Sequence, residues 1–468
     1  MIFGVSPKER PTQIVVFGAS GDLARKKVLP ALGALSAERP MRIVGAGRSS
    51  LDPKQFHDLV GAATGSAELA HDAHWVHLDY HDCESYAELA TQVGTGEDAV
   101  FYLATPPTTF SPILAGISHN GLAHRGDGRR IVVEKPFGSD LAGARNINQH
   151  LGELFEDGQI FRIDHYLAKD TVQNVMALRF SNSLFEPVWN RTMIESIQIT
   201  AAEQQDIGTR AGYYEGIGAT RDMIQNHVLQ LLALIAMEPP TTLDPADVSS
   251  AKLELLRAVR PLDPALSVRG QYEGYLDAKG VKPDSRRETY AAAQIAIENW
   301  RWEGVPIFLR SGKALKRQLT EVVVRLRDAP ALRIGGRRQR PIPTLLVIRF
   351  QPDEGITLRI GAKRPGARFE MVPAGMRLEY QQLARSALPD AYENVLAEVL
   401  TGGHSLFPSG KEIERCWEIV DPLISAWEAD GHPEIYARGS WGPGAADDLV
   451  GARGGGRWIA SGDEPGTR

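Results

Sequence analysis

The sequence contains only two cysteines, Cys83 and Cys416, and their spacing matches no metal-binding or redox motif. So few cysteines are typical of a protein from a reducing compartment. The first ten residues also lack the apolar stretch of a secretory signal peptide. We therefore expect a cytoplasmic protein, and we predict no metal site.

Neither sign of charge is in large excess, because 52 Lys and Arg residues face 58 Asp and Glu residues and the formal net charge is −6. Such a balance lacks the electrostatic footprint of a nucleic-acid-binding or membrane-surface protein. The longest apolar run, LLALIAM at 231–237, is far shorter than the ~20 residues that a membrane-spanning helix needs. We therefore expect no nucleic-acid partner and no membrane partner, and an anionic ligand must be bound by local groups.

At 468 residues the chain has room for two or three domains of roughly 100–200 residues each. In its first part, short apolar segments alternate with segments of helical length. The apolar segments are TQIVVFG at 12–18, MRIVGAG at 41–47, HWVHLDY at 74–80, DAVFYLA at 98–104 and RIVVEKP at 130–136. This alternation predicts an α/β domain with a Rossmann-like, doubly wound parallel sheet.

Beyond about residue 190 the apolar residues tend to alternate with polar ones. The alternating segments are ESIQITA, EVVVRL, TLLVIRF, GITLRI and RFEMV, and QPDEG is typical of a hairpin connection. A period of two predicts an antiparallel sheet with one covered face. Helical patterns follow in DAYENVLAEVL and EIERCWEIVDPLISAWEA. The second part is therefore predicted to be an α+β domain with a large antiparallel sheet.

Gly18 and Gly21 lie where the first apolar segment meets a helical one. At such a strand-to-helix turn, backbone N–H groups and the helix dipole can cradle a pyrophosphate. The pattern departs from G-x-G-x-x-G, because Ser20 and Leu23 stand at the second and third glycine positions. A tight turn that needs positive φ at glycine explains the motif equally well.

Two basic residues follow other predicted strands. Arg48 stands where an NAD-specific site would place an acidic residue, and a guanidinium there suits a 2′-phosphate, which favours NADP over NAD. Lys135 ends the segment VVEK, and ligands of open α/β sheets bind beyond the carboxyl ends of the strands. Lys135 is therefore a candidate contact for substrate or nicotinamide. The alternatives are an ordinary surface arginine and a solvated lysine beside a turn.

The segment FRIDHYLAKD, residues 161–170, gathers an acid, an imidazole, a phenol and an ammonium. Asp164 is predicted to cap a helix that begins at His165, which would place His165 and Lys169 on one face of the first turn. Helix starts favour anions, so with the Tyr166 hydroxyl this turn is predicted to bind phosphate. An ordinary cap with a surface lysine is the alternative.

The segment GYYEGIGATRDMIQNHVLQLLALIAMEPP predicts a helix with a polar first part and an apolar later part. Its polar part carries Asp222, Gln225, Asn226 and His227. A partly desolvated histidine at this junction, with an ordinary pKa of ~6.5, is suited to act as a base. The alternative is a histidine at the edge of the core that a backbone carbonyl satisfies.

Five segments occur in one order between about residue 12 and about residue 445: GASGDLARKK, EKPFG, RIDHYLAKD, RDMIQNH and NWRWEGVPIFLRSGK. Each is weak alone, but the ordered set resembles the glucose-6-phosphate dehydrogenase family. The resemblance implies hydride transfer from the first carbon of β-D-glucose 6-phosphate to NADP, giving 6-phosphogluconolactone in the first step of the oxidative pentose phosphate pathway. NAD is implied as a less preferred cofactor.

The resemblance also implies the organisation of the chain and the roles of its residues. It implies an NADP-binding domain over 1–164, a substrate-binding and dimerisation α+β domain over 165–468, and a homodimer or homotetramer.

His227 is implied as the general base, and Asp164 as the group that orients its imidazole. The 6-phosphate is assigned to His165, Tyr166 and Lys169. The sugar hydroxyls are assigned to Glu203, Asp222, Lys135 and Lys313. The cofactor is assigned to Gly18, Ala19, Ser20, Gly21, Asp22, Leu23, Lys27, Arg48, Asp79, Tyr80 and Lys135. The peptide bond before Pro136 is implied to be cis.

Three positions depart from the family pattern. Ala168 stands where glycine is usual, and we expect little effect because alanine favours helix. Gln318 stands where a second basic contact is common, with Lys316 as its candidate replacement. The glycine of AEQQDIGTRAGYY is shifted, which weakens the assignment of Glu203 relative to that of Asp222.

Two other functions fit part of these motifs. An oxidoreductase of the glucose–fructose oxidoreductase and inositol dehydrogenase type also joins a dinucleotide domain to an antiparallel sheet and uses Lys-Pro after a strand. Such enzymes lack RIDHYL, and a free sugar has no use for His165 and Lys169 together. The second alternative is a catalytically silent NADP or sugar-phosphate sensor. A sensor is expected to lose the base or its partner, whereas Asp164 and His227 are both present.

Overall fold

The chain folds into two compact units. The structure is a computed structural model that describes residues 11–94, 98–334, 337–366, 369–383, 389–429, 431–452 and 456–461. The first ten residues, on which the prediction about a signal peptide depends, lie outside these ranges. Unit 1 comprises residues 1–169, 241–249 and 389–414, and unit 2 comprises residues 170–240, 250–388 and 415–468. Each unit therefore contains segments that are far apart along the chain.

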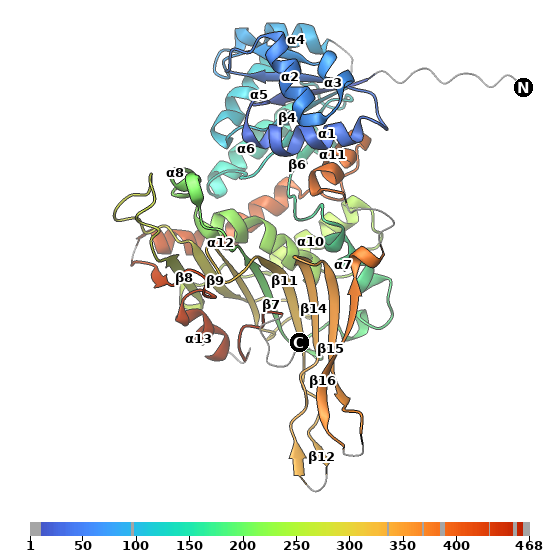
Figure 1. Cartoon of the computed structure of the whole chain (residues 1–468), viewed down its shortest axis with the longest axis vertical. Coiled ribbons are helices and arrows are strands. Elements are labelled where there is room, and N and C mark those ends of the chain that lie inside the picture. Colours follow the sequence, from blue (N-terminus) through green and yellow to red (C-terminus); the bar gives the residue numbers. More distant parts are fainter. Residues whose placement is uncertain are drawn as a thin grey trace, which may run out of the picture. The chain divides into compact units, whose positions relative to one another are not determined.

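Unit 1 is built on a six-stranded sheet with the order β3-β2-β1-β4-β5-β6. Figure 1 labels two of its strands, β4 and β6. Its strands are β1 (Thr12–Phe17), β2 (Met41–Gly47), β3 (His74–His77), β4 (Ala99–Leu103), β5 (Arg130–Val133) and β6 (Ile160–Arg162). All neighbouring pairs are parallel, and β1 pairs with both β2 and β4, so the strand order reverses at β1. This confirms the predicted Rossmann-like sheet. The short strand β6 was not predicted.

Helices cover the sheet of unit 1 and close its core. They are η1 (Ala24–Val28), α1 (Leu29–Leu35), α2 (Pro53–Thr64), α3 (Ala67–His71), α4 (Ala87–Val93), α5 (Phe110–His119), α6 (Leu141–Leu154) and α11 (Ala391–Thr401). Helix α11 comes from the distant end of the chain, and its buried Leu396 and Val399 belong to the same apolar core as Val16 of β1. Buried residues of α11 recur at helical spacing, which gives it one apolar face that it buries in this core.

Unit 2 contains a nine-stranded sheet with the order β16-β15-β14-β11-β7-β10-β9-β8-β17. The strands are β7 (Ile194–Ala202), β8 (Ser267–Tyr272), β9 (Tyr290–Ile295), β10 (Ile307–Gly312), β11 (Leu319–Leu326), β14 (Leu345–Gln351), β15 (Gly355–Lys363), β16 (Met371–Glu379) and β17 (Glu434–Tyr436). Only the pairs β7·β10 and β8·β17 of this sheet are parallel among the described residues. The large, mostly antiparallel sheet and the QPDEG connection between β14 and β15 were both predicted.

Strands β9 and β10 were missed because every residue of β10 and all but one of β9 are buried. A strand that is covered on both faces shows no alternation of apolar and polar residues. The short strands β12 (Leu332–Ile334) and β13 (Arg337–Gln339) form a separate two-stranded ribbon.

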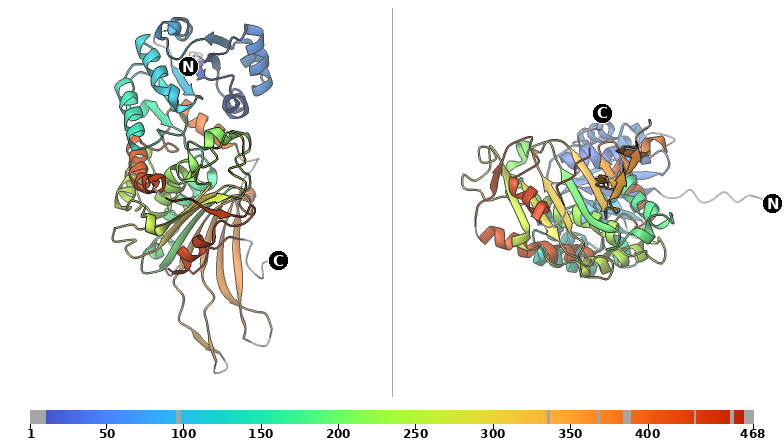
Figure 2. Two further views of the ribbon diagram at one scale, coloured as in Figure 1. Left: turned by 90° about the vertical axis from the view of Figure 1, so that its left-hand side faces the viewer. Right: turned by 90° about the horizontal axis from the view of Figure 1, so that it is seen from below.

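Helices of unit 2 lie against its sheet (Figure 2). The helices that lie wholly in unit 2 are α7 (Asp170–Phe180), α8 (Ala211–Tyr214), η7 (Thr220–Val228), α9 (Leu229–Ala236) and α13 (Gly444–Ala452). Two more, α10 (Pro245–Ala258) and α12 (Gly410–Ala429), begin in residues of unit 1 and continue into unit 2. The segment η7 contacts β7 and β10 in the middle of the sheet, and α7 contacts β14. Helix η7 is therefore supported by the most buried strands of the unit.

Two kinds of feature are absent from the described ranges. No helix there combines the length and the apolar character that crossing a bilayer requires. No group of three or more His, Cys, Asp or Glu side chains in the same ranges is arranged to hold a metal ion.

Candidate active site

The glycine turn follows β1 directly. Gly18 has φ of +79°, its N–H donates to the carbonyl of Ala46 over 2.7 Å, and the N–H of Gly21 donates to the carbonyl of Gly18 over 2.9 Å. A Cβ atom at Gly18 would lie 2.9 Å from the carbonyl oxygen of Ala104, so no larger residue fits. The turn leads at once into helical backbone beyond the carboxyl end of β1. This cradle has the place and the closeness of approach that a dinucleotide pyrophosphate requires.

Arg48 lies beside this turn. Its guanidinium carbon is 5.7 Å from the centre of the Tyr80 ring, and the Tyr80 hydroxyl hydrogen-bonds the backbone of Gly18. Burial raises the pKa of Tyr80, while Arg48 and the bond to Gly18 act in the opposite direction. The hydroxyls of Ser20 and Ser49 are 3.2 Å apart. The structure therefore brings together the turn, the end of β2 and the segment after β3, as the assignment of cofactor residues requires.

The remaining predicted cofactor residues of unit 1 lie near the same edge of the sheet. Asp79 is exposed, and its Oδ1 accepts from the N–H of His81 over 3.0 Å. Asp22 is exposed and pairs with Lys26 over 3.1 Å. Lys135 is half-buried beyond the end of β5, and the Lys135–Pro136 bond is cis, as the resemblance implied.

Glu134 is buried directly before Lys135. It accepts a hydrogen bond from the Tyr102 hydroxyl over 2.7 Å and another from Tyr392 of α11. Burial raises the pKa of Glu134, and the two tyrosine hydroxyls oppose that shift because they stabilise the carboxylate. These bonds attach the backbone that carries Lys135 to the core of unit 1.

Lys27 lies in η1, a segment of π-helix that follows the glycine turn. Its Nζ is 3.0 Å from Oδ2 of Asp390. No sequence motif pointed to Asp390, which is 363 residues away along the chain. Short π-helical segments occur frequently at functional sites, and Lys27 is a residue that the resemblance assigned to the cofactor.

The prediction of a helix that begins at His165 was wrong. Residues 165–168 form turns, and helix α7 begins at Asp170. Asp164 accepts from the N–H of Tyr166 over 2.9 Å, and the N–H of Leu167 donates to the carbonyl of Asp164 over 3.0 Å. The short Asp164 side chain closes a local turn here. This turn competes with the regular helix that Asp164 would otherwise cap.

The turns still gather the predicted phosphate ligands. Lys169 Nζ lies 5.0 Å from the centre of the Tyr166 ring, and the rings of His165 and Tyr166 are 5.1 Å apart. Ala168 is buried in this turn, and its carbonyl accepts from Asn394 Nδ2 over 2.9 Å. The alanine therefore needs no helical geometry, contrary to our expectation for this position.

Lys313 follows β10 and lies between two carboxylates. Its Nζ donates to Asp222 Oδ2 over 3.1 Å and also to Glu203. Burial favours the neutral amine, but the two carboxylates outweigh it, so the pKa of Lys313 is raised. An ammonium held between two acids offers both donors and acceptors, which suits vicinal sugar hydroxyls.

The backbone supports the assignment of Glu203. Its N–H donates to the carbonyl of Gly312 over 2.9 Å, and its carbonyl accepts from the N–H of Leu315 over 3.0 Å. Both Glu203 and Asp222 therefore reach Lys313 despite the shifted glycine. Lys316 is exposed, and Gln318 accepts from the N–H of Gln204 over 3.4 Å.

Tyr214 is a residue of this cluster that the sequence argument did not select. The centre of its ring is 5.4 Å from Lys313 Nζ, and the side chain is buried. Burial raises the pKa of Tyr214, and the charges of Asp222 and Glu203 raise it further. Its place in GYYEG, shortly before RDMIQNH, was the signal available in the sequence.

His227 lies in η7, which is a π-helix over its whole length. The histidine is fully buried, whereas we had expected only partial desolvation. Asp222 and His227 are five residues apart, and the i to i+5 hydrogen bonds of a π-helix widen each turn, which brings these two positions toward one face. In an α-helix the same two positions would be rotated by about 140° from each other. The π-helical register therefore puts the proposed base on the same side as the carboxylate that binds Lys313.

Four side-chain donors secure the end of the helix that continues from η7. Arg179 donates to the carbonyls of Leu234 and Met237 over 2.9 and 2.8 Å. Trp189 Nε1 donates to the carbonyl of Ile235, and Trp302 Nε1 to that of Ala236, both over 2.7 Å. These carbonyls have no acceptor role within the helix, so the donors satisfy them and fix the position of α9.

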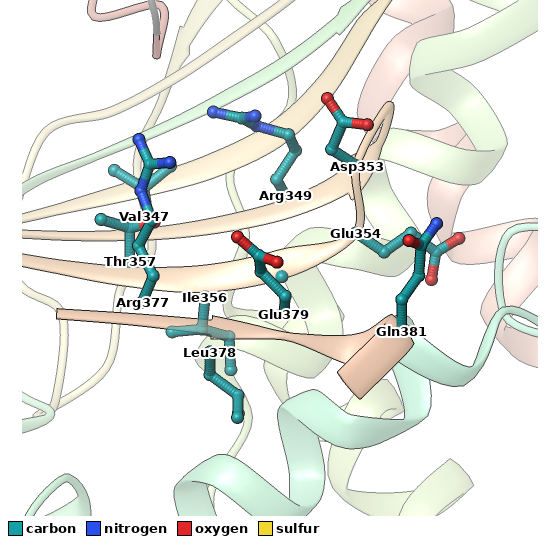
Figure 3. A pocket seen from close by; sticks show the side chains of 11 residues that line it. Val347, Arg349, Asp353, Glu354, Ile356, Thr357, Arg377, Leu378, Glu379 and Gln381 are labelled. Carbon is teal, nitrogen blue, oxygen red and sulfur yellow. The ribbon is translucent and has the colours of Figure 1, made fainter. Parts of the chain in front are cut away.

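A pocket of about 260 Å³ lies elsewhere in unit 2, on strands β14, β15 and β16. Figure 3 shows its charged lining, which includes Arg349, Arg377, Asp353, Glu354 and Glu379. None of the residues that the sequence argument selected lines it. The candidate active site is therefore not this pocket.

The selected residues divide between the two units. Unit 1 holds the glycine turn, Lys27, Arg48, Asp79, Tyr80, Lys135, Asp164, His165, Tyr166 and Lys169, and unit 2 holds Glu203, Asp222, His227 and Lys313. Within unit 1 the structure joins Gly18, Arg48 and Tyr80 and gathers the predicted phosphate ligands. Within unit 2 it joins Glu203 and Asp222 to Lys313.

Comparison with known families decides the affiliation of the chain. The family model described as "Glucose-6-phosphate dehydrogenase, NAD binding domain" matches residues 15–174, and "Glucose-6-phosphate dehydrogenase, C-terminal domain" matches residues 176–459. The chain belongs to the glucose-6-phosphate dehydrogenase family. It is therefore an oxidoreductase with a nicotinamide-dinucleotide-binding domain, and this membership decides against the inositol dehydrogenase type.

Relatives and solved structures of the glucose-6-phosphate dehydrogenase family match nearly the whole chain. Glucose-6-phosphate 1-dehydrogenase 2 of Mycobacterium tuberculosis is 41% identical over 478 residues, which cover 94% of this chain and 93% of the relative. The enzyme of Treponema pallidum is 40% identical over 482 residues, with coverage of 94% and 93%. The crystal structure from Mycobacterium avium has a TM-score of 0.86 at 36% identity, covering 96% of this chain and 98% of that one. A glucose-6-phosphate dehydrogenase in complex with its substrate glucose 6-phosphate has a TM-score of 0.87 at 32% identity, covering 98% and 100%.

Proposed function

We propose that the protein is a glucose-6-phosphate 1-dehydrogenase that prefers NADP. The observation that carries this proposal is the cluster in which Lys313 binds Asp222 while the π-helical register places His227 on the face of Asp222. On this proposal the cluster offers sugar-binding groups on the helix face that also carries the proposed base. The phosphate ligands in unit 1 and the family membership support the same substrate.

His227 takes the proton of the hydroxyl on the first carbon as the hydride leaves that carbon. The C–O single bond becomes a carbonyl, so the product is a lactone. NADP, when bound, accepts the hydride with its electron pair. The Gly18 cradle, which has no room for a Cβ, and the Arg48–Tyr80 pair fit such a dinucleotide. We propose that Asp164 orients the His227 imidazole and stabilises its charged form.

The other assigned side chains bind and orient the sugar phosphate. Lys169 and His165 neutralise the charge of the 6-phosphate, and the Tyr166 hydroxyl adds a donor. Glu203 and Asp222 accept from sugar hydroxyls, and Lys313 donates to them. Lys135, beyond the end of β5, contacts both the sugar and the cofactor.

The decisive experiment compares NADP and NAD reduction, followed by absorbance, with glucose 6-phosphate and with unphosphorylated glucose. We expect kcat/KM to be at least about 100-fold higher for the phosphorylated sugar, because a lysine, a histidine and a tyrosine hydroxyl bind its phosphate. If the folded protein binds NADP but turns over none of the four pairs, the proposal is wrong and the sensor function replaces it.

The preference for NADP depends on Arg48. Replacing Arg48 by alanine is expected to raise KM for NADP by at least about tenfold, because a charge-assisted bond to the 2′-phosphate is lost. KM for NAD should change by less than about threefold, since NAD lacks that phosphate. Arg39→Ala is the matched control, because Arg39 is exposed just before β2 and Arg48 just after it. Equal losses for the two cofactors would contradict recognition of the 2′-phosphate.

We further propose that the protein is a homodimer or homotetramer that uses the sheet edge at β16. This strand is outermost in the sheet of unit 2, and Met376 and Leu378 on it are 56% and 40% exposed. Exposed apolar side chains on an outer strand are typical of an association surface. Light scattering after gel filtration should show the oligomer for the native chain and dissociation for Leu378→Glu. Leu276→Glu, at a side chain that is 41% exposed in a turn, should leave it intact. A native monomer would contradict this proposal.

A further inference from the structure

Asp390, the N-cap residue directly before helix α11, has two partners. Oδ1 of Asp390 accepts from the N–H of Tyr392 over 2.9 Å, which caps the helix, and Oδ2 accepts from Lys27 Nζ over 3.0 Å. One carboxylate therefore joins the start of α11 to the π-helical segment that follows the glycine turn. The two oxygens divide these tasks, so the pairing with Lys27 does not displace the cap.

The first turn of the same helix is tied to other parts of the candidate site. The Tyr392 hydroxyl hydrogen-bonds Glu134, which immediately precedes Lys135. Asn394 Nδ2 donates to the carbonyl of Ala168 over 2.9 Å, immediately before Lys169. Residues 390, 392 and 394 thus connect three segments of unit 1 that are far apart in sequence. Each segment carries a lysine that the family resemblance assigned to the cofactor or the substrate.

The ion pair between Lys27 and Asp390 contributes little to stability. Their side chains are 48% and 44% exposed, and ion pairs with such exposure are screened by water and salt. The pair also constrains two flexible side chains, which costs conformational entropy. Its consequence is therefore geometric, because the Lys27 ammonium is held at one place beside the nucleotide turn.

The charge on Asp390 is maintained by its surroundings. Burial tends to raise its pKa, but the N–H of Tyr392 and the Lys27 ammonium lower it more, with a further contribution from Lys169. The pKa of Asp390 is accordingly lowered overall, and the group is ionised at neutral pH. Asp390 therefore carries a negative charge close to two lysines that the proposed function assigns to the cofactor and to the phosphate.

We propose that Asp390 is a positioning residue that holds Lys27 in place for cofactor and substrate. This inference rests on the proposed function, because Lys27 has its assigned role only in that reaction. Asp390 itself contacts neither ligand. Its effect passes through Lys27, so removing Lys27 should make the identity of residue 390 unimportant.

A double-mutant cycle tests this dependence. The variants are Asp390→Asn, Lys27→Met and the double variant, and asparagine is chosen because it also caps helices. We expect each single variant to lower kcat/KM for NADP-dependent oxidation of glucose 6-phosphate by about tenfold, since small displacements of positioned groups are costly. The kcat/KM of the double variant should be no more than about twofold below that of the less active single variant, because both substitutions remove the same interaction.

Asp52→Asn is the matched control. Asp52 caps α2 in the same unit by accepting from the N–H of Gln55 over 2.8 Å, and it pairs with no predicted site residue in the described structure. Its replacement should leave kcat and KM unchanged. The melting temperatures of Asp390→Asn and Asp52→Asn should both stay close to that of the native chain, which separates positioning from a loss of stability.

Two results would overturn the proposal. One is an unchanged kcat/KM for Asp390→Asn, and the other is a double variant whose loss equals the product of the two single losses. If the native chain does not oxidise glucose 6-phosphate, the proposed function has failed, and the same four variants are then compared by NADP binding. Non-additive losses of NADP affinity support the positioning role in that case, and additive losses or no loss reject it.

Discussion

Replacing His227 by asparagine is expected to lower kcat for glucose 6-phosphate oxidation by at least about 100-fold, because general-base catalysis contributes about 10²–10⁴ to such rates. Asparagine is similar in size to histidine but cannot accept the hydroxyl proton at neutral pH. KM should change by less than about threefold, since His227 acts on the proton in the transition state. Steady-state kinetics with NADP at saturating and varied sugar phosphate measures both constants.

Lys169→Ala provides the contrasting variant for this prediction. Lys169 lies over the Tyr166 ring in the phosphate cluster, so its loss should mainly raise KM for glucose 6-phosphate. Unchanged NADP binding and an unchanged melting temperature would show that His227→Asn is folded. Near-normal turnover in His227→Asn, together with abolished turnover and unchanged binding in Lys169→Ala, would reverse the two assignments.

Replacing Arg179 by methionine should lower the free energy of unfolding of unit 2 by about 3 kcal/mol, since buried carbonyls lose charge-assisted donors. Arg179 is fully buried, and burial lowers its pKa to about 10 while Glu186 opposes that shift. The guanidinium is therefore charged at neutral pH, and it bonds two terminal carbonyls of α9. Methionine fills a similar volume without these bonds. Urea denaturation followed by tryptophan fluorescence measures the change.

Arg191→Met is the matched control for the change at Arg179. The guanidinium carbon of Arg179 lies 5.5 Å from the centre of the Trp189 ring. Arg191 likewise lies against a tryptophan, at 4.6 Å from the centre of the Trp300 ring, but Trp300 is 85% exposed. Its replacement should change the free energy of unfolding by less than about 0.5 kcal/mol, as surface substitutions usually do. If both variants unfolded at the same urea concentration, the bonds to α9 would not be a main source of stability.

The periodicity of apolar residues was sufficient to predict both sheets in outline. Parallel strands buried between helices appear as short continuous apolar runs, and β1, β2 and β4 were found in this way. The alternation of apolar and polar residues in GITLRI revealed the antiparallel strand β15, of which only Ile356 is buried. Both patterns are local consequences of burial, so they are visible without knowledge of the neighbours.

The residues of the candidate site were proposed from the sequence, but their backbone conformation was not predicted. The ordered motifs selected Asp164, Lys313 and His227 as candidate site residues, because chemical groups at fixed spacing are a property of the sequence. The start of α7 at Asp170 was not predicted, since helix and Asx turn compete closely at a position such as Asp164. The energy difference between such local alternatives is small, and contacts with the rest of the unit decide it.

The sequence by itself determined the family and the two kinds of sheet, and it supplied the hypothesis about which side chains react. Only the tertiary structure decided that η7 is a π-helix and that Asp222 and His227 therefore share a face. It also decided that α11 belongs to unit 1 and that Asp390 pairs with Lys27 across 363 residues of chain. The physical reason is the range of the interactions. Periodicity and spacing record the burial and chemistry of neighbouring residues, whereas the partner of a side chain in a distant segment is fixed only when the core brings the two segments together.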